Sequence, residues 1–277
     1  MRLVPALTVC SLFVCACTSG EKNAAGTAAA TPAVVTYHAK DFAYTGPDSI
    51  SAGMTELRLV NDGMTLHHMQ LVRLDSGKTL ADLNEALKKP GMPPMWAVFV
   101  PGPNAPDPGT QSNATVDLAA GNYAIICLVD IPGHVPHFVK GMQKALTVTA
   151  AKGPAIAAPV AQVSITVSDY SFALSKPLVA GKQTVAVVGK GPQPHEVEII
   201  RFDPGKTMKD LGAWMEKPEG PPPAHGVGGV SATLPGVTAY FTVDLPPGDY
   251  VLVCFLPDGK DGKMHMEHGM LQPFKIT

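Results

Sequence analysis

The fold is decided by one stretch that occurs twice. It reads HHMQLVRLDSGKT at residues 67–79 and HEVEIIRFDPGKT at residues 195–207, and the two align without a gap. After the leading His, apolar side chains such as Met69 and Leu71 fall at alternate positions, which is typical of a strand with one buried face. The repeat therefore predicts two copies of one domain.

Short apolar segments flank this stretch at corresponding places in both copies. The chain has 27 Gly and 27 Pro among its 277 residues, and apolar segments separated by turns favour short strands packed as a β-sandwich. We expect strands at 57–60, 114–118, 124–127 and 145–148 in the first copy and at 163–167, 185–188, 241–245, 251–254 and 274–276 in the second. The sequence thus predicts an all-β protein.

One short helix is inserted in each copy. Leu80, Leu83 and Leu87 recur at helical spacing. Thr79 directly before them is a good N-cap, and Thr207 holds the same place in the second copy. The glycine-rich run at residues 226–229 has no such pattern and is predicted to be a flexible loop.

The first residues have the features of an export signal. Met1-Arg2 is short and positive, and the apolar segment that continues to Cys15 is too short to span a bilayer. The run Val14-Cys15-Ala16-Cys17 resembles the cleavage site of a bacterial lipoprotein signal, which implies that Cys17 carries lipid after cleavage. The alternative is an ordinary secretory signal with a chance cysteine. We expect an exported protein of the cell envelope, in the periplasm or on the cell surface, held at a membrane by its N-terminal lipid.

Composition divides the rest of the chain. We expect a signal peptide at 1–16, a flexible tether at 17–33, a first domain at 34–150, a linker at 151–161 and a second domain at 162–277. The formal net charge of −2 gives no electrostatic reason to expect binding to nucleic acid.

Four residues of metal-ligand type recur in the same order in both copies. They are His67, Cys127, His137 and Met142 in the first and His195, Cys254, His265 and Met270 in the second. Equivalent strands of two domains rarely come close enough for a disulfide, so each cysteine is expected to serve its own domain.

Two other histidines compete for a place among these ligands. His134 competes with His137, but only His137 keeps the His-x₄-Met spacing of both copies. His68 is expected to point to the opposite face of its strand from His67.

With these residues the chain resembles the cupredoxins, the plastocyanin-like blue copper proteins. Their Gly-x-Tyr-x-x-x-Cys approach to the ligand cysteine appears at 121–127 and 248–254. The resemblance implies two tandem Greek-key β-sandwiches and at most one copper per domain. A thiolate, two imidazoles and a long axial thioether suit both Cu(I) and Cu(II). The chain departs from the family in the loop between Cys and His, which has nine residues at 128–136 and ten at 255–264 where plastocyanin-like proteins have only a few.

The residues are compatible with three classes of function. The first is a copper-binding protein for electron transfer or copper handling, with a redox partner protein. The second is a copper enzyme, which we exclude because Cys127 and Cys254 have no flanking His and no His-x-His motif occurs to bind a second copper centre. The third is a metal-free interaction module on the cell surface, which the residues alone do not separate from the first.

Overall fold

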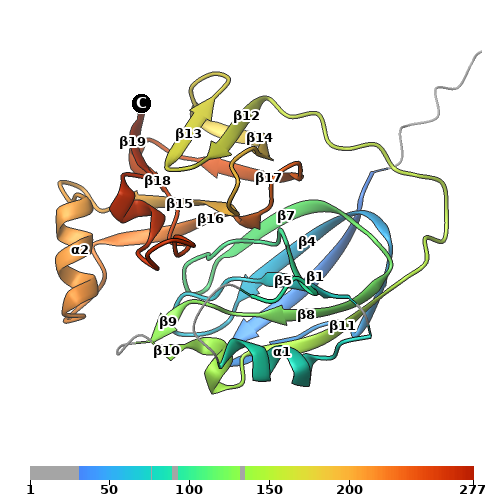
Figure 1. The fold of residues 1–277 in the computed structure, drawn as a ribbon. Coiled ribbons are helices and arrows are strands. Elements are labelled where there is room, and N and C mark those ends of the chain that lie inside the picture. Colours follow the sequence, from blue (N-terminus) through green and yellow to red (C-terminus); the bar gives the residue numbers. More distant parts are fainter. Residues whose placement is uncertain (1–30, 76, 89–92, 132–134) are drawn as a thin grey trace, which may run out of the picture.

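The computed structural model describes residues 31–75, 77–88, 93–131 and 135–277. The predicted signal peptide, Cys17 and His134 lie outside the described residues. Strands dominate the described part, which has two α-helices (Figure 1), so the all-β prediction is confirmed. No described helix has the length and apolar character needed to cross a membrane.

One eight-stranded sheet runs through both halves of the molecule, here called the first half (residues 33–149) and the second half (residues 163–276). Its strand order is β13 (Ser171–Leu174), β12 (Val163–Ser168), β14 (Gly181–Gly189), β17 (Thr238–Leu245), β7 (Gln111–Leu118), β4 (Gly53–Asn61), β1 (Ala33–Lys40) and β2 (Ala43–Thr45). The strands predicted from alternation lie in β4, β7, β12, β14 and β17.

A smaller sheet covers the shared sheet in each half. The first half has β3 (Ser49–Ser51), β11 (Gln143–Thr149), β8 (Gly121–Ile126), β5 (Gln70–Leu74) and β6 (Ala97–Val100), in that order. The second half has β16 (Ala224–Thr233), β15 (His195–Phe202), β18 (Gly248–Val253) and β19 (Leu271–Ile276). Buried side chains from the facing sheets, such as Leu57 and Ile125 in the first half, form one apolar core. Burial of these faces is the main stabilising term.

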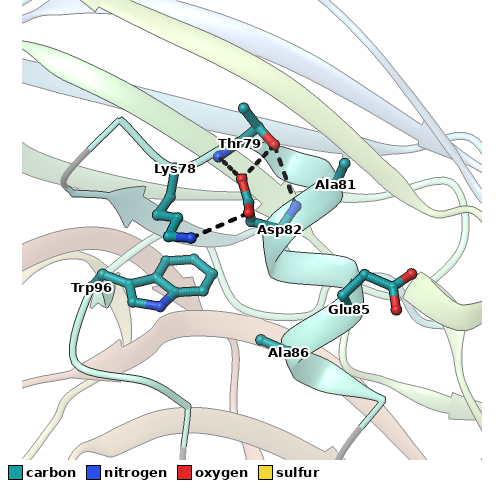
Figure 2. A pocket seen from close by; sticks show the side chains of 7 residues that line it. All are labelled: Lys78, Thr79, Ala81, Asp82, Glu85, Ala86 and Trp96. Atoms are coloured by element: carbon teal, nitrogen blue, oxygen red, sulfur yellow. Dashed lines mark hydrogen bonds and ion pairs between the residues drawn. The ribbon is translucent and has the colours of Figure 1, made fainter.

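The two helices cover the outer faces of the smaller sheets (Figure 1). In α1 (Leu80–Leu87), Thr79 Oγ1 accepts a hydrogen bond from Asp82 N at 3.2 Å, and Thr79 N donates to Asp82 Oδ2 at 2.9 Å. This capping box fixes the helix start, and Figure 2 shows it beside a shallow hollow rimmed by Trp96. Thr207 holds the N-cap position of α2 (Met208–Glu216), where its N–H and its hydroxyl donate to Asp210 Oδ2 at 2.9 and 2.7 Å. Both predicted helices and caps are therefore confirmed.

The halves meet directly in the shared sheet, while residues 151–161 run along the outside (Figure 1). At the junction, β17 and β7 are antiparallel with Tyr240 opposite Thr115. Beside this pair, the side-chain amide of Asn113 bonds to the backbone of Thr242 as a neighbouring strand would. Its Nδ2 donates to Thr242 O at 2.7 Å, and its Oδ1 accepts from Thr242 N at 2.8 Å. Two different halves are thereby hydrogen-bonded into one layer.

The glycine-rich run at 226–229 is part of β16, so its prediction as a flexible loop was wrong. The glycines permit close packing rather than mobility. A Cβ on Gly228 would lie 2.6 Å from Cβ of Ser112, and a Cβ on Gly229 would lie 2.0 Å from the carbonyl oxygen of Val197. Both glycines also have positive φ, 108° and 144°, a conformation that other residues rarely adopt.

Candidate metal centres

The first His-Cys-His group lies at one end of the first half. His67 lies in the turn between β4 and β5, Cys127 directly follows β8, and His137 begins the 3₁₀ helix η1 (His137–Lys140). The Nδ1 atoms of the two histidines are 3.1 Å apart, and Cys127 Sγ is 3.5 Å from His137 Nδ1. All three residues are buried, so three soft or borderline donor atoms converge where water is excluded.

The second group repeats this geometry. His195 is the first residue of β15, Cys254 directly follows β18, and His265 begins η2 (His265–His268). The two Nδ1 atoms are 3.1 Å apart, and Cys254 Sγ is 3.4 Å from His265 Nδ1. Both cysteines are buried free thiols, as expected if each serves its own half.

The long Cys-to-His loops fold back on themselves and return the histidine to the cysteine. In the first half, β9 (Asp130–Ile131) pairs with β10 (Val135–Pro136). The backbone N–H of His137 donates to Val129 O at 2.9 Å, and that of Phe138 donates to Cys127 O at 2.9 Å. In the second half, Pro257 and Met264 form a bridge at the same place. Hairpin pairing therefore supplies the constraint that a short loop would otherwise impose.

The two methionines lie beside the cysteines at the level of the backbone. The N–H of Cys127 donates to Met142 O at 3.2 Å, and the N–H of Cys254 donates to Met270 O at 3.3 Å. Both methionine side chains are buried. The glycine before each one, Gly141 or Gly269, has a positive φ that closes the 3₁₀ helix and turns the chain into the last strand.

The donor separations fit a small, thiophilic metal ion. Metal–nitrogen distances of about 2.0 Å and metal–sulphur distances of about 2.3 Å place such donors about 3.1–3.5 Å apart, close to the 3.1–3.5 Å separations between donor atoms in the two groups. Thiolate with imidazole is a donor set that selects copper among biological metals able to change oxidation state. Copper is accordingly the cofactor that the two groups imply.

Burial favours the neutral form of the imidazoles, which metal binding requires, and also favours the protonated form of the thiols, which metal binding opposes. Burial, together with the nearby His137, lowers the pKa of His67 from 6.5 to about 4. Burial also lowers the pKa values of His195 and His265. In contrast, burial raises the pKa of the Cys127 thiol to about 11, and it raises that of Cys254. Without metal the histidines are neutral and the thiols protonated at pH 7, so metal binding must release the thiol protons.

The residue after the first histidine differs between the halves. His68 is buried with Nδ1 3.7 Å from Cys127 Sγ, so the expectation that it turns away from the site was wrong. The physical reason is that residues 66–69 precede β5 and do not alternate as a strand does. In the second half this place belongs to Glu196, whose backbone N–H donates to Cys254 Sγ at 3.5 Å.

Glycines make room for the outer edge of each imidazole. A Cβ on Gly63 would lie 2.5 Å from His67 Nε2, and a Cβ on Gly191 would lie 2.8 Å from His195 Nε2. His67 Nε2 is buried without a hydrogen-bond partner. His195 Nε2 donates to Asp169 Oδ1 at 3.0 Å. Asp169 was not predicted from the sequence to be a functional residue, although its place just after a strand and its counterpart Asp41 could have indicated it.

A second carboxylate approaches the second group. Asp258 is buried, and its Oδ2 lies 3.9 Å from His265 Nε2. That oxygen accepts hydrogen bonds from Tyr170 Oη at 2.5 Å and from Gln193 Nε2 at 2.8 Å. These hydrogen bonds lower the pKa of Asp258 and keep it ionised. The histidines of the second half thus face two carboxylates.

No family model matches the chain, and no curated protein matches it. Auracyanin A, a blue copper protein from the green thermophilic photosynthetic bacterium Chloroflexus aurantiacus, is 22% identical over 43% of this chain and 100% of its own, with a TM-score of 0.30. The blue copper oxidase from Nitrosomonas europaea is 14% identical over 89% of this chain and 86% of its own, with a TM-score of 0.27. The copper nitrite reductase from Nitrosomonas europaea is 14% identical over 89% of this chain and 94% of its own, with a TM-score of 0.26.

These structures correct the exclusion of an enzyme. That exclusion rested on the absence of His beside Cys127 and Cys254 and of any His-x-His motif. Similar structures that extend over both halves include a copper oxidase and a copper nitrite reductase, so the exclusion was wrong. In its fold and in its two His-Cys-His donor groups, this chain resembles the blue copper cupredoxins.

Proposed function

We propose that the protein is an exported, membrane-tethered copper protein that transfers electrons, or handles copper, through two mononuclear sites. One observation carries the proposal. In each half a cysteine and two histidines, all at most 1% exposed, place their donor atoms within 4.8 Å of one another. A redox partner protein is the expected source or acceptor of electrons.

The protein contributes rigid, dry ligand positions. Copper held by a thiolate and two imidazoles can exchange one electron with little change in geometry. The ends of β8 and β18 fix the two cysteines, and the 3₁₀ helices fix His137 and His265 by backbone hydrogen bonds. Such ligands are already in place before the metal binds, which reduces the rearrangement that accompanies a change in charge.

We further propose Met142 and Met270 as the fourth, axial ligands. Their burial and their backbone contact with the ligand cysteines support this assignment. The finer architecture is proposed as two cupredoxin-like Greek-key sandwiches at 34–150 and 162–277 with the linker at 151–161. Each has its own smaller sheet and shares the eight-stranded sheet with the other.

Copper addition to single-cysteine variants tests the proposal. The full chain with Cys127→Ser keeps only the second site, and the chain with Cys254→Ser keeps only the first. Each variant should bind one Cu(II) and show thiolate-to-copper charge-transfer absorption, while the double variant should show none. Circular dichroism of the variants checks that the fold survives. Intact, reduced protein with neither colour nor tight copper binding would rule out the proposed sites, and tight Cu(I) binding without colour would favour copper handling.

Export and tethering are proposed from the N-terminal sequence. The positive start, the short apolar segment and the run ending in Cys17 support a lipoprotein signal. The expected result is that the mature chain begins at Cys17 with attached lipid, detected by mass spectrometry. Cys17→Ala should release the protein from the membrane fraction, whereas Cys10→Ala should not.

A further inference from the structure

The two candidate copper sites differ on the outer side of their histidines. In the second half, Asp169 accepts a hydrogen bond from His195 Nε2 at 3.0 Å. In the first half, Asp41 follows β1 as Asp169 follows β12, yet His67 Nε2 has no hydrogen-bond partner. The charge of Asp41 acts to raise the pKa of His67 against the larger effect of burial, but Asp41 forms no hydrogen bond with that ring nitrogen as Asp169 does with His195.

The residues that face the other histidine differ in the same direction. The hydroxyl of Tyr170 in the second half donates a hydrogen bond to Asp258, and Asp258 lies near His265. Phe42 holds the place of Tyr170 in the first half, and its ring packs edge-on against His137 with centroids 5.2 Å apart. Each site has an aromatic ring edge-on to its second histidine and one buried imidazole Nε2 without a hydrogen-bond partner. The difference is that only in the second site is a carboxylate, Asp169, hydrogen-bonded to the first histidine, with Asp258 Oδ2 3.9 Å from the other.

A carboxylate bonded to a ligand imidazole has two physical effects. It holds the ring as the tautomer with a proton on Nε2, which leaves the Nδ1 lone pair free for the metal, and it increases ligand basicity. Its negative charge also stabilises Cu(II) more than Cu(I), because the divalent ion carries the larger charge. His195 is fully buried and the side chain of Asp169 is 25% exposed, so salt screens this interaction only in part.

We propose that Asp169 is a positioning residue that sets the reduction potential of the second copper site below that of the first. The inference rests on the proposed copper binding. In a molecule that holds two coppers and one added electron, the electron then resides at the first site as Cu(I), and the second remains Cu(II). The direction of transfer within the chain follows from this order.

Potentiometric titration of single-site chains tests the order. The Cys127→Ser and Cys254→Ser chains are each loaded with copper and titrated while the charge-transfer absorption is recorded. The site with Asp169 should have the lower midpoint potential. In the Cys127→Ser chain, Asp169→Asn should lower the affinity for Cu(II) relative to Cu(I) at least about tenfold, as expected for loss of an outer-shell partner. A tenfold change in this ratio equals 59 mV for one electron, so the midpoint potential should rise by at least about 59 mV.

Two further variants separate charge from structure. Asp169→Glu keeps the charge and should restore most of the potential, which a purely structural role would not predict. Asp41→Asn in the Cys254→Ser chain is the matched control and should change the ratio of Cu(II) to Cu(I) affinity less than about twofold, or about 18 mV.

The outcomes distinguish the inference from the proposed function. A second site that binds copper but has a potential equal to or above that of the first, or one unmoved by Asp169→Asn, overturns the inference alone. If Asp169→Asn does not bind copper, the comparison of the two single-site chains still decides the order. Absence of copper from both single-site chains overturns the proposed function instead.

Discussion

Replacing Gly63 by alanine would push a methyl group into the imidazole of His67. The added Cβ would lie 2.5 Å from Nε2 and 2.9 Å from Cδ2 of that ring. Ordinary contacts begin at about 3.5 Å, so the ring must move by about 1 Å. A metal site tolerates displacements of only about 0.5 Å. We therefore expect Gly63→Ala to weaken copper binding at the first site at least about tenfold and to lower the free energy of unfolding by about 1–3 kcal/mol.

Copper competition and urea unfolding check this prediction. Affinity is measured against a chelator in the Cys254→Ser chain, where only the first site remains. Gly212→Ala is the matched control, because it adds a methyl in the middle of α2 where nothing lies within 4 Å. It should stabilise the chain by about 0.5–1 kcal/mol through helix propensity. If Gly63→Ala bound copper as tightly as the parent chain and unfolded at the same urea concentration, the steric argument would be refuted.

Two other measurements test the electrostatics and the junction between the halves. Burial raises the pKa of Cys127 to about 11, while the pKa of His67 is about 4. Copper binding between about pH 5 and pH 10 should therefore release one proton from the thiol, and the apparent copper affinity of the first site should rise about tenfold per pH unit. Calorimetry in buffers of different ionisation enthalpy detects this proton, and an affinity that does not change with pH would contradict a thiolate ligand. Asn104→Ala removes hydrogen bonds to Glu196 Oε2 and Val197 O at 3.2 and 3.3 Å. Because both acceptors stay buried, the free energy of unfolding measured in urea should fall by about 2–4 kcal/mol. A loss below about 1 kcal/mol would mean that water replaces the amide.

The predictions that succeeded from sequence rest on local or repeated signals. Thr79 and Thr207 were identified as helix caps because a cap depends only on the next three residues. The two His-Cys-His groups were expected to come together because their order occurs twice, and the structure brings each set together; their role as metal ligands stays a prediction. His137 Nδ1 lies 3.5 Å from Cys127 Sγ, as the shared His-x₄-Met spacing favoured.

The predictions that failed depend on contacts between distant parts of the chain. The run at 226–229 has the composition of a loop, yet it forms a strand because Gly226 approaches Ala105 and Gly228 approaches Ser112. Local propensity contains no information about such partners. The approach of His68 to Cys127 was missed for the same reason, since strand alternation was applied to residues that precede the strand.

The junction between the halves also makes the second candidate site depend on the first half. Asn104 of the first half donates to Glu196 Oε2 at 3.2 Å, and Glu196 Oε1 accepts from the N–H of Phe255 at 2.8 Å. Glu196 and Phe255 are the neighbours in the sequence of His195 and Cys254, two of the proposed ligands. Burial raises the pKa of Glu196 to about 7, and the hydrogen bonds from Phe255 and Asn104 oppose this rise. The buried carboxylate therefore depends on these two hydrogen bonds to offset its lost hydration. A disturbance of the junction should therefore reach the second site through Glu196 before it reaches the first.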